Sequence, residues 1–268
     1  MRRHRRASVA FAIAIVGAGC PGATSSLEPL PPGGHHVLFV GNSLTYVNDL
    51  PATVAAIGAS AGDTIRVAME AGPGLALIDH LTGSSSAVQR IAQGRWEFVI
   101  LSQGPTPSGL CRDSLVLWTQ LFDTRIRAVG GRTALFMTWP PSAQAGIFDD
   151  VRLSFQYAAV AVNGVFMPAG EAWRSALRVD SSLVLYGADQ FHPSAIGTFL
   201  AALEIYERVT GHDARNLPLQ AFSGGQPITL PAATIQLLHN AAHDANTRFP
   251  ATPMLDPLIP STIPVGHC

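Results

Sequence analysis

Short apolar runs alternate with helical patterns along the chain, and this alternation restricts the possible folds more than any other feature. The runs are Val37–Val40, Ile65–Ala68, Phe98–Leu101, Ala134–Met137 and Val165–Met167. Each run is apolar at successive positions, as in parallel strands that helices cover on both faces. The alternation predicts a doubly wound, three-layer α/β/α sandwich around a five-stranded parallel sheet.

The segments between the apolar runs have the periodicity of helices. Residues 194–209 place apolar side chains three and four positions apart, with Pro193 at the start and Gly211 just past the end. Proline at the first turn and glycine after the last are typical helix boundaries. Further helices are expected over 113–129 and 232–247. The domain is therefore predicted to span 35–249, followed by a Pro-rich C-terminal tail over 250–268.

The charged side chains exclude two classes of function. All 17 positive residues are arginine, so a Walker A phosphate loop and Schiff-base lysine chemistry are excluded. Four of the arginines lie within the first six residues, and the rest of the chain carries 13 arginines against 18 acidic residues, a net of −5. A nucleic-acid-binding surface needs excess positive charge, so no nucleic-acid partner is expected.

The N-terminus has the pattern of an export signal. A basic start is followed by an apolar run that ends in small residues, which predicts a signal peptide over 1–19. Cys20 directly follows these small residues, and the junction resembles a bacterial lipoprotein cleavage box with Cys20 as the lipidated residue. Residues 20–34, rich in Pro, Gly and Ser, are predicted to be a tether. Ordinary signal cleavage and an uncleaved anchor are the alternatives to a membrane-attached lipoprotein.

The other two cysteines permit two interpretations. If Cys20 carries the lipid, Cys111 and Cys268 would be able to pair in an oxidising compartment. Two unpaired thiols are an equal alternative, because spacing in the sequence does not place the two side chains within bonding distance.

A candidate nucleophile lies directly after the first strand. Ser43 follows Gly41 and Asn42 at the carboxyl end of the Val37–Val40 run, where open α/β sheets place their active crevices. Gly41 permits a sharp turn, and the N–H of Ser43 is then able to stabilise a developing oxyanion. The alternative is a simple strand-to-helix turn in which Asn42 or Ser43 only caps the helix.

A candidate base and its partner lie just before the helix over 194–209. Asp189 precedes His192 by three residues, a spacing that lets the carboxylate hold Nδ1–H of the imidazole. Nε2 is then free to accept a proton from Ser43. An isolated pair of this kind is often only structural, but here the serine motif precedes it in the chain.

These motifs together resemble the SGNH, or GDSL-like, hydrolases. Residues 41–44 (GNSL) are similar to the first block of the family, in its Gly-Asn-Ser form found in secreted bacterial members. Asp189 and His192 are similar to its last block. The softer similarities are GPGLALIDH (72–80), WEFVILSQGP (96–105), WPP (139–141) and PAGEAW (168–173). The resemblance covers residues 36 to about 217 and implies a flavodoxin-like fold and metal-independent ester hydrolysis.

The resemblance also implies an oxyanion hole built from Ser43 and two further donors. The second-block glycine falls on Gly74, with Gly72 as the alternative. The family's third block, Gly-x-Asn-Asp, is absent, and LSQGPT stands in its place. Gln103 is the predicted third donor, and Thr106 is the alternative. The remaining possibility is that neither side chain contributes to the oxyanion hole.

Other conspicuous residues favour structural roles. His239 and His243 have a zinc-compatible spacing, but Asn240 stands where the zincin motif needs glutamate, so no metal is predicted. Trp139 and Trp173 are expected in the core or the cleft wall.

The sequence therefore predicts an exported serine esterase or deacylase that needs no cofactor. Its expected substrates are small acyl esters, lipids or acylated carbohydrates. The alternative function is a ligand-binding lipoprotein on the same fold with weak or no turnover.

Overall fold

The computed structural model describes residues 33–107 and 109–260. The predicted signal peptide, Cys20, nearly all of the tether and the end of the tail, with Cys268, lie outside these residues. Cys111 is disulfide-bonded, so the alternative of an unpaired thiol is wrong for Cys111. Its pairing with Cys268, the other alternative, stays a prediction. Among the described helices, none is both long enough and apolar enough to cross a membrane.

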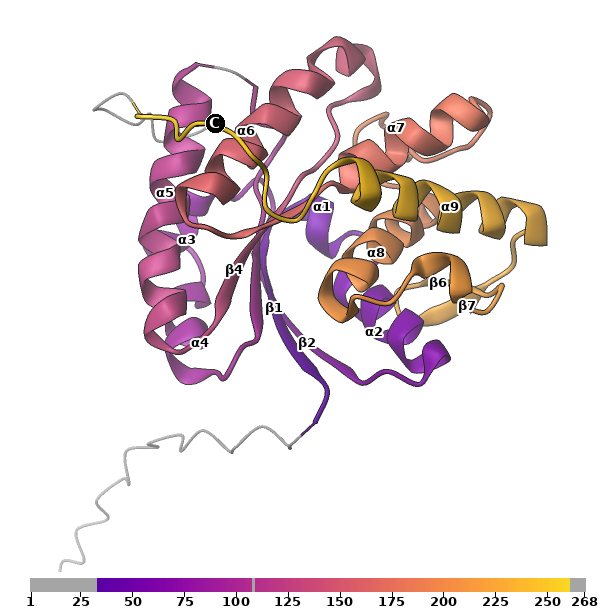
Figure 1. Ribbon diagram of the computed structural model, residues 1–268, viewed down its shortest axis with the longest axis horizontal. Helices are drawn as coiled ribbons and strands as arrows, with labels where there is room; N and C mark the ends of the chain where they lie inside the picture. The colour runs from indigo at the N-terminus through magenta and orange to yellow at the C-terminus, as the bar shows by residue number, and fades with distance from the viewer. Residues whose placement is uncertain (1–32, 108, 261–268) are drawn as a thin grey trace, which may run out of the picture.

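A parallel sheet forms the centre of the molecule (Figure 1). In the described chain it has five strands in the order β2-β1-β3-β4-β5, all parallel. The strands are β1 (His35–Gly41), β2 (Ile65–Ala71), β3 (Phe98–Leu101), β4 (Arg132–Phe136) and β5 (Val165–Met167). This order confirms the predicted doubly wound fold, and the chain reverses its direction of winding between β1 and β3.

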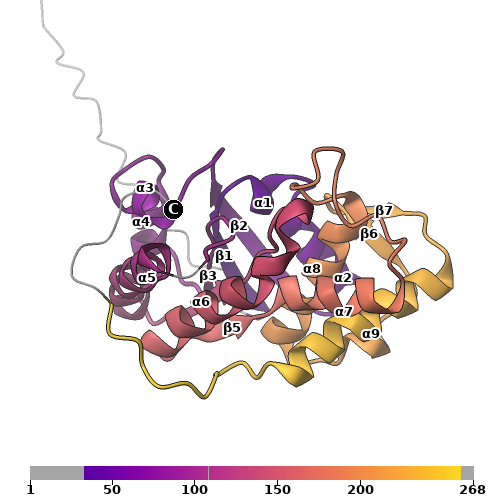
Figure 2. The same ribbon diagram turned by 90° about the horizontal axis from the view of Figure 1, so that it is seen from above.

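Helices cover both faces of the sheet, as the two views show (Figures 1 and 2). One layer contains α3 (Leu77–Leu81), α4 (Ala87–Gln93), α5 (Leu110–Ala128) and α6 (Phe148–Ala161). The other contains α2 (Leu50–Ala61), α7 (Ala169–Val179), α8 (Ala195–Thr210) and α9 (Ala232–Arg248). The short helix α1 (Ser43–Tyr46) follows β1 directly.

Burial explains why apolar and polar residues do not alternate along the strands. Every residue of β3 and β5 is buried, because side chains on both faces pack under helices. The edge strand β2 is only partly buried after Ile65. Two buried aromatic rings, Trp139 in the loop after β4 and Trp173 on α7, stack at 3.6 Å between centroids. They therefore belong to the core, which is one of the two roles predicted for them.

The sequence patterns missed two features of the fold. Residues 221–228 form a two-stranded antiparallel hairpin of β6 (Ala221–Ser223) and β7 (Gln226–Ile228). Gly224 and Gly225 both have positive φ in its turn, which is the usual role of a Gly-Gly pair. Helix α5 also begins at Leu110, three residues before the predicted start.

A buried carboxyl on α8 makes the stability depend on pH. Glu204 is fully buried, and in the described structure neither of its carboxyl oxygens has a hydrogen-bond partner. Nε of Arg208 lies 3.8 Å from Oε1, yet burial raises the pKa of Glu204 from 4.5 to about 8. The folded protein therefore holds this proton over a pH range in which the unfolded chain has lost it.

We expect the wild-type free energy of unfolding to fall as pH rises from about 4.5 to about 8 relative to that of Glu204→Gln. The folded state binds more protons in this window, so its stability declines there and levels off above it. The difference should reach on the order of 2–4 kcal/mol. Urea unfolding of both proteins at pH 5 and pH 8.5 measures it, and equal pH dependence would show that Glu204 titrates normally.

Candidate active site

The candidate nucleophile lies at the carboxyl end of β1, where the strand turns into α1. The side chain of Asn42 caps the helix by accepting a hydrogen bond from Leu44 N–H at 3.0 Å. Gly41 is required because a Cβ there would lie 2.3 Å from Oγ1 of Thr45. The glycine thus lets α1 start directly against the strand end, with Ser43 as its first residue.

The candidate base lies in the loop before α8. Oδ1 of Asp189 accepts hydrogen bonds from the N–H groups of Phe191 at 3.1 Å and His192 at 3.0 Å. The other oxygen, Oδ2, is 2.5 Å from Nδ1 of His192. These contacts, led by the one to the imidazole, lower the pKa of Asp189 to about 2. The carboxylate therefore fixes both the ring and the main chain that carries it.

The structure brings all three predicted catalytic side chains together. Nε2 of His192 is 2.8 Å from Oγ of Ser43, across 149 residues of sequence. Because Nδ1 faces a carboxylate, it carries the proton, and Nε2 is the acceptor for the serine hydroxyl. The side chains of His192 and Asp189 are 32% and 53% exposed, so the chain of groups is open to a ligand from solvent.

A cavity of about 300 Å³ adjoins Ser43. It is lined by Asn42, Ser43, Leu44, Gly74, Leu75, Ala76, Gly104 and Phe191. Gly74 has φ +65°, a conformation that favours glycine. Within the described chain the N–H groups of Ser43, Gly74 and Gly104 donate to no protein acceptor, so they are available to a ligand oxygen.

The side chain of Gln103 does not line this cavity. It is buried, its Nε2 donates to Oγ1 of Thr106 at 3.0 Å, and its Oε1 accepts from Leu77 N–H at 3.3 Å. Gln103 thus connects the loop after β3 with the start of α3. Gly104, which the sequence analysis did not predict as a donor, lines the cavity in place of Gln103. Gly72 does not contribute to the lining either.

Comparison with known proteins supports the fold. No protein-family model and no curated protein matches the chain. A DUF4886 family protein from Bacteroides uniformis is similar, with 15% identity and a TM-score of 0.67 over 82% of this chain and 97% of its own. A candidate SGNH hydrolase from Slackia heliotrinireducens is similar, with 25% identity and a TM-score of 0.54 over 65% of this chain and 98% of its own. The chain shares the fold of these two proteins.

A buried histidine supports the strand end that carries Ser43. Nε2 of His80 is 2.9 Å from the carbonyl oxygen of Gly41, and Nδ1 is 2.6 Å from Oγ of Ser85. Burial lowers the pKa of His80, which favours a neutral ring. Because a carbonyl only accepts, Nε2 carries the proton and Ser85 donates to Nδ1. Nothing in the sequence pattern distinguished this histidine from the others.

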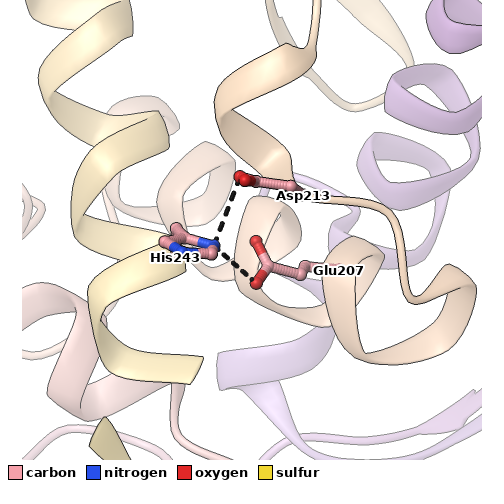
Figure 3. Close-up of side chains that lie close together, drawn as sticks. All are labelled: Glu207, Asp213 and His243. Atoms are coloured by element: carbon pink, nitrogen blue, oxygen red, sulfur yellow. Dashed lines mark hydrogen bonds and ion pairs between the residues drawn. The ribbon is translucent and has the colours of Figure 1, made fainter. Parts of the chain in front are cut away.

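A second polar cluster, at the far ends of α8 and α9, brings Glu207, Asp213 and His243 together (Figure 3). Nδ1 of His243 lies 2.9 Å from Glu207 and 3.2 Å from Asp213. Asp213 is also held by the guanidinium of Arg215, and Glu207 accepts from Ala214 N–H at 2.9 Å. Protein donors thus already engage both carboxylates, and the cluster joins two helices and the loop between them.

The other conspicuous side chains lie in the core or pair with neighbouring side chains. His239 does not join His243, because it is fully buried beside Phe199, where burial lowers its pKa to about 4. Glu171 is buried and forms ion pairs with Arg152 and Arg174.

Proposed function

We propose that this protein is a serine hydrolase of the SGNH type that cleaves carboxylic esters. The observation that carries the proposal is the continuous contact from Ser43 Oγ through the His192 ring to Asp189. These groups lie at the carboxyl ends of the strands, beside the point where the winding of the sheet reverses. The fold shared with a candidate SGNH hydrolase agrees with this assignment.

The geometry supports a two-step acyl transfer. Ser43 Oγ attacks the ester carbonyl carbon while Nε2 of His192 accepts its proton. The N–H groups of Ser43, Gly74 and Gly104 stabilise the oxyanion. The imidazolium then protonates the departing alcohol, and the acyl group stays on Ser43. Water, deprotonated by His192, releases the acid and restores the serine. Asp189 keeps the ring oriented throughout, and no metal or cofactor takes part.

The cavity favours esters with short, uncharged acyl groups. Its volume of about 300 Å³ is at the small end of the range for ligand pockets. Leucine, alanine and phenylalanine side chains contribute to the lining, and no residue in it is ionisable. A long acyl chain would extend into solvent without gaining apolar contact.

We expect protein without residues 1–32 to hydrolyse p-nitrophenyl butyrate at least about tenfold faster than the palmitate ester, measured as kcat/KM. Leu75→Ala should shift the optimum toward longer chains, because it enlarges the cavity. Leu121→Ala, at a 45% exposed position on α5, is the matched control and should leave the profile unchanged. Saturable binding of these esters without any turnover would instead favour the alternative of a ligand-binding lipoprotein.

Cys20 is proposed to carry the lipid that attaches an exported protein to the bacterial envelope. The support is its position after a basic segment and an apolar run, and before a segment rich in Pro, Gly and Ser. A linker of about 14 residues spans on the order of 20 Å. We expect full-length protein in the membrane fraction and Cys20→Ala in the soluble exported fraction. If both occur in the soluble fraction with the same mature N-terminus, simple secretion replaces this proposal.

A further inference from the structure

The loop that carries His192 is held at consecutive main-chain carbonyls. The carbonyl of Gln190 accepts from Ser142 N–H at 3.0 Å, and that of Phe191 accepts from Nε1 of Trp139 at 3.1 Å. Within the loop, the His192 carbonyl accepts from Gly187 N–H at 2.7 Å. The first two bonds fix the loop against the segment after β4, and the third fixes its own curvature.

A side chain from another part of the chain also holds the loop. Nδ2 of Asn48 donates to the carbonyl of Pro193 at 2.9 Å and to Oγ1 of Thr198 at 3.1 Å. Asn48 lies five residues after Ser43, in the turn between α1 and α2. Its amide therefore joins the turn that follows the nucleophile to the residue that follows the base, across 145 residues of sequence.

The turn itself is built to present this amide. Asn48 has φ +58°, in the left-handed region that asparagine tolerates better than most residues. Its carbonyl accepts from Gly224 N–H at 2.9 Å, so the β6–β7 hairpin fixes the main chain of the turn. The backbone is thus held independently of the side chain, which is free to serve as a link.

We propose that Asn48 is the positioning residue that sets the distance between Ser43 and His192. This proposal rests on the proposed function, because it assigns to Asn48 the alignment of the proton-transfer pair. Without the amide, the loop keeps its bonds to the segment after β4 and to the chain just before it, such as Ser194 N–H to the Leu185 carbonyl at 2.8 Å. It loses its side-chain link to the turn that follows Ser43, so the imidazole is able to move away from Ser43 Oγ. Small displacements of a catalytic group lower the rate strongly, so the loss appears in kcat rather than in KM.

The test compares Asn48→Gly and Asn48→Asp with wild type. Glycine keeps the positive φ, and aspartate keeps the size but donates nothing to Pro193. Both are expected to lower kcat for p-nitrophenyl butyrate about 10- to 100-fold with little change in KM. In a His192→Ala background, Asn48→Gly should cause no further loss, because Asn48 acts through His192. An additive loss in that background overturns the proposal.

Asn246→Ala is the matched control. Asn246 also donates from Nδ2 to a main-chain carbonyl, that of Glu204 at 3.1 Å, but between α8 and α9. The Asn246→Ala substitution should lower the free energy of unfolding while leaving kcat unchanged. If Asn48→Gly behaves in the same way, its role is only structural and the proposal is wrong.

A measurement that needs no turnover separates the positioning role of Asn48 from the proposed esterase function. Ring ¹H–¹⁵N signals of His192 should be sharp in wild type and Asn246→Ala, and broadened or shifted in Asn48→Gly. Unchanged ring signals in Asn48→Gly overturn the positioning role whether or not the protein cleaves esters. Absence of turnover by wild type, with ring signals that respond to Asn48, contradicts only the proposed function.

Discussion

Ser43→Ala is expected to lower kcat/KM for p-nitrophenyl butyrate by about three to six orders of magnitude, because it removes the atom that forms the acyl-enzyme. The fold should be unaffected, since the hydroxyl contacts His192 at the protein surface rather than the core. Thermal unfolding of both proteins checks this point.

Ser60→Ala is the matched control for this substitution. The Ser60 hydroxyl donates to the Ile57 carbonyl within α2, away from the cavity. The control should retain full activity. Activity of Ser43→Ala within about tenfold of wild type would remove this serine from the mechanism.

The second large effect is expected at His192, where alanine should lower kcat about as much as Ser43→Ala does. The two groups act as one unit, so the double variant should be no slower than either single variant. Asp189→Ala should retain about 10- to 100-fold more activity than His192→Ala, because an unsupported imidazole still accepts a proton. Steady-state kinetics on all four proteins test this order.

The low pKa of Asp189 adds a constraint on pH dependence. Its folded value, lowered to about 2, lies below its ordinary value, so its contribution to folded-state stability is present above about pH 4 and is lost as pH falls toward 2. Across assays between pH 5 and 9 the carboxylate therefore stays ionised. A kinetic step in that range that persists in Asp189→Asn belongs to another group. Protonation of the Asp189 carboxyl itself between pH 5 and 9, followed by ¹³C NMR, would contradict this low pKa.

The sequence alone was enough to predict the parallel sheet and the catalytic residues that meet at its edge. Buried parallel strands need apolar residues on both faces, so runs such as Phe98–Leu101 are visible without a structure. Ser43 and His192 were predictable as partners because the carboxyl ends of such strands converge at one edge. The serine motif and the Asp-His motif are also short, so each can be recognised from a few consecutive residues.

Contacts between distant loops were not predictable from the sequence. Asn48 is one of several polar turn residues, and only the folded chain places its amide against Pro193. Gln103 had the right chemistry for an oxyanion donor, but its amide is engaged by Thr106 and Leu77. Gly104 contributes only its backbone to the cavity, so no side-chain pattern marks it.

The most direct test of the central claim is covalent labelling with a fluorophosphonate probe, followed by tandem mass spectrometry. The account predicts one adduct per molecule, on Ser43, with labelling slowed strongly in His192→Ala and unchanged in Ser60→Ala. Butyrate ester in excess should protect the site. An adduct on Ser60 or another serine, or hydrolysis that continues in protein fully labelled on Ser43, would contradict the assignment of Ser43 as the nucleophile.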